Sequence, residues 1–508
     1  MNTSSPEGTA AEPCRITHLI GHEYWDGEAE RTSPVFNPAT GEITGRLDLA
    51  SKELLDEVVA KAAVAQRLWG AASLTRRARV LFAYRELLNA DKERIAALIT
   101  AEHGKVLSDA LGEVTRGLEV VEFACGIPHL LKGGHSEGVS TNVDSYSLLQ
   151  PLGVVGVISP FNFPAMVPMW FVPIAVAAGN AVIIKPSEKD PSAANAMAEL
   201  WRKAGLPAHI VNVVHGDKEA VDALLDNPTV KAISFVGSTP VGKYVYQRGT
   251  ANGKRVQALG GAKNHMLVLP DADLDLAADA AVNAGFGSAG ERCMAVSVVL
   301  ATESIAGDLV SRIVERIHTL KTGDGTRGCD MGPIVTEQAR DRIAGYIEAG
   351  AKAGATLVVD GRDGPFDGGP EGYFVGPTLF DNVATDMTIY ADEIFGPVLS
   401  VVRVSGYEEG LQLINDSPYG NGAVIFTNDG GAARRFEVEV QAGMVGINVP
   451  VPVPMAYYSF GGWKDSLFGD SHAHGMEGVH FYTRTKAVTR RWPDPSHRGL
   501  QLGFPQNT

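Results

Sequence analysis

Residues Gly153–Lys185 read GVVGVISPFNFPAMVPMWFVPIAVAAGNAVIIK, and no residue from Ser145 to Ile184 carries a charge. A helix that spans a membrane needs about 20 apolar residues without breaks, and this run contains four prolines, Pro160, Pro164, Pro168 and Pro173. The stretch instead predicts a strand at 153–159, a turn at 160–164, a helix to about residue 178 and a strand at 181–185. Uninterrupted apolar strands are typical of a parallel sheet that is buried on both faces.

The alternation of strands and helices extends well beyond this stretch. Residues 51–104 have apolar positions at helical spacing before it. After it, the pattern predicts helices at 192–204, 219–226 and 240–248, with strands at 210–214 and 232–236 between them. A second series begins near Gly260, with a strand at 266–269 and a helix at 274–285. This order favours open α/β sheets, with a surface loop at 360–372 and a β-like tail at 481–488.

Length and composition restrict the class of protein. The chain has 508 residues with 44 Lys and Arg against 59 Asp and Glu, a net charge of −15, which argues against binding to nucleic acid or to an anionic membrane. Four cysteines in this length make no disulfide framework. The N-terminus has neither the basic and apolar regions of a signal peptide nor an Arg-rich transit pattern. We therefore expect a cytoplasmic protein.

Glycine-rich stretches were compared with the dinucleotide fingerprint, which requires a strand, a glycine turn and then a helix. The G-x-G-x-x-G matches at Gly285–Gly290 and Gly323–Gly328 follow an expected helix and lie in an expected loop, so neither predicts a phosphate site. The segment Ser234–Gly242 is a better candidate, because a buried strand runs into a helix with Ser238 or Thr239 at its N-cap and Pro240 at its first position. Its N-terminus could hold a pyrophosphate; an ordinary capped helix explains it equally well.

A second candidate is Lys185-Pro-Ser-Glu188, at the end of a buried strand, where open α/β sheets bind ligands. Its Lys and Glu could share the two hydroxyls of a ribose, one as donor and one as acceptor. Taken alone, two solvated charges after a strand are the simpler interpretation.

Cys293 is the cysteine most suited to chemistry. It lies among small residues in FGSAGERCMA (286–295), and Arg292 beside it is expected to favour the thiolate. The alternative, a packed small hydrophobe, fits Cys125 better, while Cys14 and Cys329 are expected to be ordinary thiols. His472 and His474 lack companion ligands in the sequence, and we predict no metal site.

Together these residues resemble the aldehyde dehydrogenase superfamily across nearly the whole chain. The matching motifs occur in the family's order, and they are NPATG (37–41), PFNFP (160–164), KPSE (185–188), FVGST (235–239), GERC (290–293), EIFGP (393–397) and GMVGIN (443–448). The resemblance implies an α/β fold with a Rossmann-like NAD-binding domain at 16–137 and 152–259 and a catalytic domain at 260–460. It also implies a β oligomerisation extension at 138–151 and 475–492, with a homotetramer built as a dimer of dimers. Residues 1–15 are expected to be a disordered tail.

The resemblance assigns roles to individual residues. It implies Cys293 as the nucleophile and Asn162 as a donor to the oxyanion. Lys185 and Glu188 would bind the adenosine ribose of NAD, and Glu393 the nicotinamide ribose. The rest of the implied cofactor-binding set is Ser159, Phe161, Lys189, Ser238 and Gly260.

One departure from the family pattern is informative. Hydrolytic members carry a glutamate before Leu-Gly-Gly, the base that activates water, and here that position is Ala258. Loss of a general base typically costs about 10²–10⁴-fold, whereas a thiol such as coenzyme A is already partly ionised at neutral pH. The segments GAKNH (261–265), GERCMA (290–295), GINVPVPVP (446–454), FGDSH (468–472) and FYTRTK (481–486) resemble the CoA-acylating methylmalonate-semialdehyde dehydrogenase branch.

That branch oxidises malonate or methylmalonate semialdehyde, whose carboxylate needs a cationic partner. The resemblance assigns this to Arg292 and Arg116, either of which could pair bidentately with it; for Arg116, an ion pair at i,i+3 with Glu113 or Glu119 is the alternative. The segment Met455–Tyr458 departs from the branch, which leaves the substrate the least determined point.

The sequence thus predicts an NAD-dependent oxidoreductase that decarboxylates its semialdehyde and yields acetyl-CoA or propionyl-CoA through a thioester on Cys293. Two alternatives stay open: a hydrolytic, CoA-independent semialdehyde dehydrogenase with Glu291 as a surrogate base, and a catalytically idle binding protein on the same fold.

Overall fold

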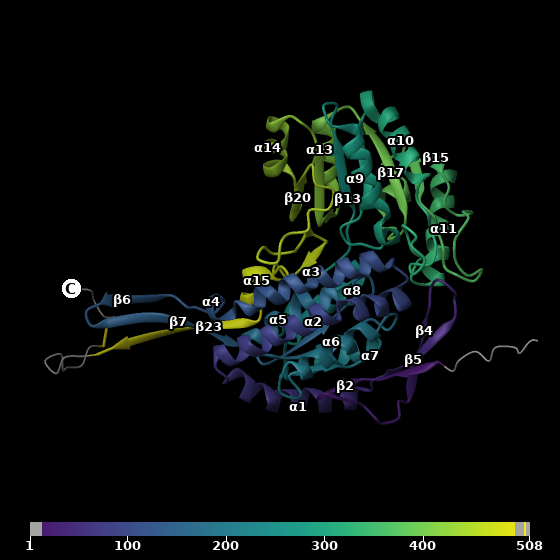
Figure 1. Cartoon of the computed structure of the whole chain (residues 1–508). Coiled ribbons are helices and arrows are strands. Elements are labelled where there is room, and N and C mark those ends of the chain that lie inside the picture. The colour runs from purple at the N-terminus through teal and green to yellow at the C-terminus, as the bar shows by residue number, and fades with distance from the viewer. Residues whose placement is uncertain (1–12, 493–501, 504–508) are drawn as a thin grey trace, which may run out of the picture.

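A computed structural model describes residues 13–492 and 502–503. The N-terminal half of the chain, together with β22 from near the C-terminus, forms an eight-stranded sheet in the order β22-β12-β11-β8-β9-β10-β2-β3 (Figure 1). Its five central strands are parallel, and β22, β2 and β3 complete the edges in antiparallel pairing. The bounds are β2 Leu19–Ile20, β3 Glu23–Tyr24, β8 Val154–Ile158, β9 Ala181–Lys185, β10 Val211–Val213, β11 Val230–Val236, β12 Arg255–Leu259 and β22 Leu467–Phe468.

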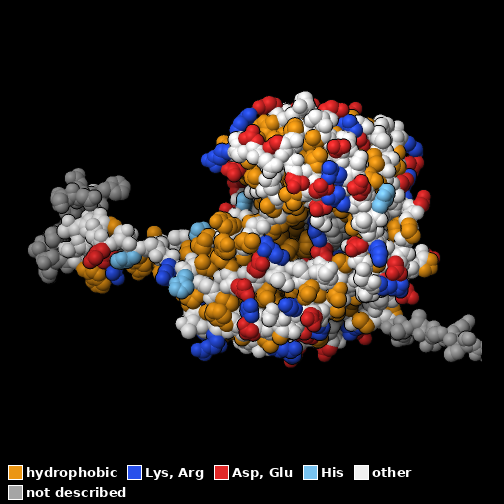
Figure 2. Space-filling view, turned by 45° about the horizontal axis from the view of Figure 1, so that its top comes forward, with side chains coloured by type: hydrophobic (Ala, Val, Ile, Leu, Met, Phe, Trp, Pro, Cys, Tyr) orange, Lys and Arg blue, Asp and Glu red, His pale blue; other side chains and the backbone are white. Residues whose placement is uncertain are grey.

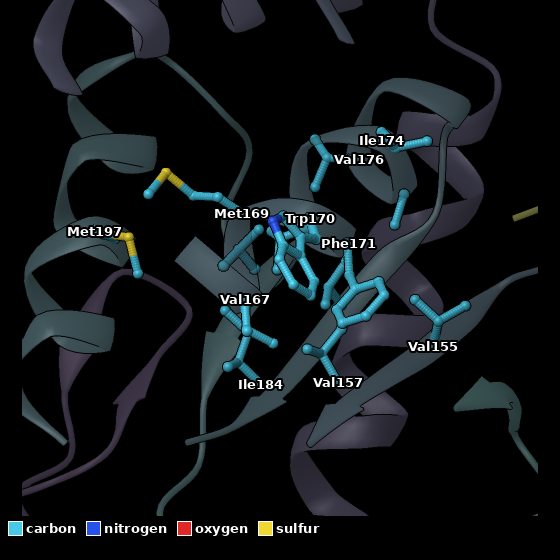
Figure 3. Close-up of a cluster of buried hydrophobic side chains, with 14 of the residues drawn as sticks. Val155, Val157, Val167, Met169, Trp170, Phe171, Ile174, Val176, Ile184 and Met197 are labelled. Atoms are coloured by element: carbon cyan, nitrogen blue, oxygen red, sulfur yellow. The ribbon is translucent and has the colours of Figure 1, made fainter. Parts of the chain in front are cut away.

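The apolar stretch between residues 153 and 185 forms the centre of this sheet, as predicted. Strands β8 and β9 pair in parallel, and every residue of both strands is buried. Helix α5 (Met166–Ala178) connects them and is buried along its whole length. Figure 3 shows Phe171 of α5 beside Val155 and Val157 of β8. This burial explains why the helix is apolar all round.

Long helices cover the sheet. Helices α1 (Lys52–Gly70), α2 (Leu74–His103) and α3 (Leu107–Cys125) form from the segment expected to be helical and its continuation. The side chains of Ser51 and Ser73 cap α1 and α2. Helix α2 packs on α3 and α6 (Ser192–Lys203), and α3 packs on α5. Helices α7 (Lys218–Asp226) and α8 (Thr239–Ala251) complete the strand–helix alternation.

The second half of the chain builds a seven-stranded sheet in the order β15-β16-β17-β14-β13-β19-β20, parallel except for β15. Its strands are β13 Asn264–Val268, β14 Val296–Thr302, β15 Thr356–Val359, β16 Thr378–Asp381, β17 Val398–Val404, β19 Gly422–Phe426 and β20 Met444–Ile447. Its helices are α9 Leu274–Phe286, α10 Glu303–Ile317, α11 Glu337–Lys352, α13 Tyr407–Asp416 and α14 Gly430–Glu439. The two α/β units expected from the sequence are therefore present.

A three-stranded sheet projects from the first unit (Figure 1). It consists of β6 (His135–Ser140), β7 (Val143–Pro151) and β23 (Thr483–Arg491), with β23 antiparallel to β7 over nine residue pairs. The expected boundaries of this extension were wrong at two places. The extension starts three residues before 138, and residues 475–481 form helix α15, which packs on α5. Phe481 and Tyr482 are buried in the first core, so the β-like tail begins at Thr483.

Three smaller expectations also need comment. Residues 1–12 of the expected disordered tail lie outside the described residues, but the tail does not extend to residue 15, because β1 (Cys14–Ile16) pairs with β5 (Ile43–Leu49). Ser238 occupies the N-cap position of α8, but its side chain accepts no capping hydrogen bond within the described residues, and Pro240 is the second helical residue. The loop at 360–372 forms as expected. No helix within the described part of the chain is long and apolar enough to cross a membrane.

Candidate active site

A cavity of about 620 Å³ lies between the two α/β units, where the surface is hollowed in Figure 2. Residues after the carboxyl ends of β8, β9, β11 and β12 form one wall. The loop before β14, the start of α11 and the loop before β17 form the other. Every predicted catalytic and cofactor residue lines it: Ser159, Phe161, Asn162, Lys185, Glu188, Lys189, Ser238, Gly260, Cys293 and Glu393. Parallel strands end at one edge of a sheet, which brings these distant motifs together.

Lys185 and Glu188 form an ion pair on this wall, with 3.1 Å between Nζ and Oε2. The Lys185 side chain is only 8% exposed, so the interpretation as two independent solvated charges is wrong. Burial alone would raise the pKa of Glu188, but the Lys185 charge and a backbone hydrogen bond hold that pKa below its usual value. Lys189 lies over the Phe161 ring at 4.3 Å, an attractive cation–π contact.

The start of α8 and the Gly260–Gly261 turn meet at the opposite end of the wall. The Gly261 amide donates to Thr239 Oγ1 at 2.9 Å, and the Ala262 amide donates to Glu393 Oε1 at 2.8 Å. A Cβ atom on Gly261 would collide with Glu393 Oε2, so a larger residue there would displace the Glu393 carboxyl from its present position. Burial raises the pKa of the Glu393 carboxyl, and the Ala262 hydrogen bond partly offsets this.

Cys293 follows a tight turn at the end of α9. Ser288 and Ala289 have φ values of 53° and 51°, and Gly290 has a φ of 73°, a strained conformation for the two non-glycine residues. Side-chain amides of Asn264 and Asn421 donate to the Cys293 carbonyl at 2.9 and 3.0 Å. The turn is therefore held firmly at the cavity. The first G-x-G-x-x-G match forms this turn, and Gly285 and Gly290 line a second, small cavity that also reaches Cys293.

Arg292 lowers the pKa of the Cys293 thiol, in the direction expected from the sequence, but too little to offset the effect of burial. Burial, followed by the Glu393 charge, raises the pKa of the thiol to about 12, and Arg292 is the weakest of the groups that lower it. The thiol is consequently protonated at neutral pH in this structure, because desolvation disfavours the charged form.

Asn162 and Glu291 contact each other beside Cys293. Asn162 is 4% exposed, and its Nδ2 donates to the Glu291 carbonyl at 3.0 Å. The Glu291 carboxyl is 1% exposed, and burial raises its pKa to about 8. Its Oε2 atom is buried without a hydrogen-bond partner among the described residues. A carboxyl that is protonated at neutral pH thus lies at the cavity, with one oxygen that has no hydrogen-bond partner among the described residues.

Neither predicted substrate arginine lines the large cavity as the described residues form it, but Arg292 lines the small cavity that reaches Cys293. Arg292 Nη2 donates to Asp109 Oδ1 at 2.7 Å. Arg116 Nη1 donates to Glu119 at 2.6 Å and Nη2 to the Pro454 carbonyl at 3.1 Å. The alternative interpretation of Arg116, an i,i+3 ion pair on the helix, is therefore present, because Glu119 lies one helical turn away on the same face.

Ala258 lies within β12 and is completely buried, opposite Phe235 on one side and Phe468 on the other. Gly260, two residues later, is the part of this segment that lines the large cavity.

Several residues in and behind the cavity are not marked by any motif in the sequence. Gln338, Ala339 and Arg342 at the start of α11 line the cavity, and Lys105 and Glu113 lie buried behind Asn162. The local signal that the chain offers is the charge of Glu113 among the apolar positions of α3. The loop match at Gly323–Gly328 does not contribute to the cavity, and the described residues contain no group of three or more His, Cys, Asp and Glu suited to a metal.

The chain is similar to known proteins over nearly its whole length. The model of the aldehyde dehydrogenase family matches residues 24–488. A malonate-semialdehyde dehydrogenase of Pseudomonas aeruginosa is 54% identical over 96% of this chain and 99% of its own. The solved methylmalonate-semialdehyde dehydrogenase of Oceanimonas doudoroffii is 52% identical, with a TM-score of 0.94 over 95% of this chain and 99% of its own. A Sinorhizobium meliloti protein solved in complex with NAD is 51% identical, with a TM-score of 0.94 over 96% and 99% of the two chains.

Proposed function

The chain belongs to the aldehyde dehydrogenase family, and we propose that it oxidises malonate or methylmalonate semialdehyde with NAD and transfers the decarboxylated acyl group to coenzyme A. The observation that carries this proposal is the convergence of Cys293, Asn162 and the Lys185–Glu188 pair on one cavity. The semialdehyde dehydrogenases that share about half of the residues over nearly full length support the substrate class.

The cavity residues fit a dinucleotide. The volume of about 620 Å³ lies in the range of ligand sites. Lys185 can donate to, and Glu188 can accept from, the two hydroxyls of a ribose. The buried Ser159 Oγ lacks a partner among the described residues and lies on the same wall. When bound, NAD would accept the hydride. Lys185 and Glu188 would hold its adenosine ribose, and Glu393 its nicotinamide ribose.

Cys293 attacks the aldehyde carbon in this proposal. Asn162 Nδ2 carries two N–H groups, and the Glu291 carbonyl takes one. The other, together with the Cys293 amide, stabilises the oxyanion, and loss of one such donor typically costs about 10²–10³-fold in rate. Because the resting thiol has a pKa raised to about 12, its proton must leave before or during attack.

Coenzyme A is the acyl acceptor because Ala258 cannot take a proton from water. The thioester on Cys293 is then attacked by the thiol of coenzyme A, which needs less base assistance than water because it is partly ionised at neutral pH. The substrate carboxylate would be bound by Arg292 and Arg116, which requires them to exchange or share Asp109 and Glu119.

A specific observation favours a second candidate, CoA-independent hydrolysis. Glu291 is a buried residue of the cavity wall, its Oε2 lacks a hydrogen-bond partner among the described residues, and its pKa is raised to about 8. A carboxyl pKa raised toward neutral pH is a property of general bases.

The test is NADH formation from malonate semialdehyde with NAD, with and without coenzyme A, followed by identification of the acyl product. We expect sustained turnover and acetyl-CoA only with coenzyme A, and no turnover in Cys293→Ala. Sustained turnover to free acid without coenzyme A would establish the hydrolytic alternative. If no NADH formed under either condition although the protein still bound NAD, the remaining interpretation would be a catalytically idle binding protein.

We propose in addition a homotetramer, a dimer of dimers, located in the cytoplasm. The projecting sheet of β6, β7 and β23 supports oligomerisation, because an isolated three-stranded sheet leaves exposed edges and faces. Sedimentation of the full chain and of a chain ending before β23 would test this.

A further inference from the structure

A fully buried ion pair lies behind Asn162. Lys105 follows α2, Glu113 lies in α3, and their side chains have no exposed surface. Lys105 Nζ donates to Glu113 Oε2 at 2.8 Å. A buried charge pair is costly to desolvate and stabilises little unless its remaining hydrogen-bonding groups are also satisfied.

The remaining groups of this pair are satisfied by one short segment, residues 162–166. Lys105 Nζ also donates to the Asn162 carbonyl at 2.6 Å. Glu113 Oε1 accepts from the amides of Ala165 and Met166 at 2.8 and 3.1 Å. The ring of Phe163 lies 4.3 Å from Lys105 Nζ.

Glu113 therefore replaces the cap that α5 lacks. Ala165 occupies the N-cap position and has no side chain able to accept a hydrogen bond from the helix amides. A carboxylate at this position also interacts favourably with the positive end of the helix dipole. The start of α5, and with it the turn before the helix, is held from α3.

Asn162 is consequently held at both ends. Lys105 holds its backbone carbonyl, and its Nδ2 donates to the Glu291 carbonyl, two residues before Cys293. The orientation of the free N–H of the amide is therefore restricted, in a cavity that Cys293 also lines. Electrostatic stabilisation of an oxyanion requires such a donor to be oriented before the reaction.

We propose that Lys105 and Glu113 are positioning residues for the acylation step, which orient the Asn162 amide toward the oxyanion formed at Cys293. This inference rests on the proposed function. Neither residue touches the substrate; both act through the backbone of residues 162–166.

The experiment compares Lys105→Met with Arg77→Met. Arg77 is a matched control because it is a buried cation that donates to the Ala177 carbonyl at 3.2 Å, at the opposite end of α5. NADH formation in the first turnover measures acylation, fluorescence titration measures NAD affinity, and thermal unfolding measures stability. We expect Lys105→Met to lower the acylation rate by about 10²-fold, the typical effect of a misplaced catalytic group, with KM and NAD affinity little changed. Arg77→Met should lower stability without this loss of rate.

A double-mutant cycle with Asn162→Ala isolates the route of the effect. Once the Asn162 amide is absent, adding Lys105→Met should change the acylation rate by no more than about twofold. A full additional 10²-fold loss in that background would overturn the proposal, as would equal rate losses in Lys105→Met and Arg77→Met.

If Lys105→Met does not fold, Lys105→Arg and Glu113→Gln replace it, since the first keeps the charge and the second keeps an acceptor for the α5 amides. Both variants should fold, and each should lower the acylation rate by less than Asn162→Ala does. In the Asn162→Ala background neither should lower the rate further. If either variant lowered the rate as much in that background as in the unmodified enzyme, the proposal would be contradicted. Inactivity of the unmodified enzyme toward malonate semialdehyde would refute the proposed function, whereas an active enzyme with unchanged acylation in these variants would refute the positioning role.

Discussion

Arg292 Nη2 donates to Asp109 Oδ1 at 2.7 Å, so the guanidinium next to the cavity cysteine is already paired with a carboxylate from α3. The Arg292 charge and a hydrogen bond lower the pKa of Asp109 although burial opposes this. Any substrate carboxylate must displace or share this partner. The strength of the Arg292–Asp109 pair should therefore control the selection of carboxylated aldehydes.

We predict that Arg292→Leu lowers kcat/KM for malonate semialdehyde far more than for propanal, by several kcal/mol, because a desolvated carboxylate loses its partner. Asp109→Asn should lower the KM for malonate semialdehyde and leave propanal unchanged, because it removes a competing charge. Steady-state kinetics with both aldehydes test this. Equal changes for the two substrates would show that the pair has only a structural role.

Arg116 gives a separate prediction, because it must leave the Glu119 carboxylate and the Pro454 carbonyl to reach a substrate. If it binds the substrate, Arg116→Leu should impair malonate semialdehyde about tenfold or more relative to propanal, consistent with a charged hydrogen bond of about 1.5–3 kcal/mol. Glu119→Gln is the control for the helix pair alone. No selective loss in Arg116→Leu would assign this arginine to the helix surface.

The raised pKa of Cys293 predicts the pH dependence of its alkylation. With a pKa of about 12, the thiolate fraction below that pH increases tenfold per pH unit, and alkylation by iodoacetamide should do the same between pH 7 and 9. Because the Glu393 charge contributes to the shift, Glu393→Gln should lower the pKa and speed the reaction at each pH. Mass spectrometry of the modified peptide measures it, with Cys293→Ala as the blank. A flat profile would indicate a stable thiolate.

Glu188 should make the enzyme prefer NAD to NADP, since its carboxylate would repel a 2′-phosphate. The Lys189 charge, which could screen Glu188, lies over the Phe161 ring. Glu188→Gln should raise kcat/KM with NADP relative to NAD by about tenfold, equivalent to about 1.4 kcal/mol of repulsion. Glu303→Gln, which removes a surface ion pair with Arg403, should leave the ratio unchanged. Equal kcat/KM with NAD and NADP in the unmodified enzyme would show that Glu188 does not contact the adenosine ribose.

Ala258 predicts a burst of NADH without coenzyme A that equals the concentration of active sites, followed by a slow phase. Coenzyme A should raise the steady rate by at least about 10²-fold. Ala258→Glu should restore some hydrolysis to the free acid, and Ala258→Gln, of the same size but without a base, should not. Since Ala258 is completely buried between two phenylalanines, thermal unfolding must accompany the kinetics. Equal hydrolysis in both variants would exclude a base at this position.

Much of the fold follows from local patterns in the chain. The apolar strands at 154–158 and 181–185 and the prolines between them predict β8, the turn and β9 within one residue, because burial on both faces demands apolar side chains at every position. The boundaries of the projecting sheet follow less well from the chain. Its last predicted segment contains α15, whose seven residues pack on α5, and such a short amphipathic segment has no local feature that separates helix from strand.

The motifs of the site were also predictable, because each follows a strand of a parallel sheet and such ends meet at one edge. The partner of each charged side chain, in contrast, could not be predicted from the sequence. Arg292 pairs with a residue 183 positions away, and the Lys105–Glu113 pair holds a turn about 50 residues further along the chain. The pKa of Cys293 depends in the same way on burial and on Glu393 rather than on its neighbour Arg292. Local periodicity and turn residues act over a few positions, whereas ion pairing and desolvation depend on distances through space, which exist only in the folded chain.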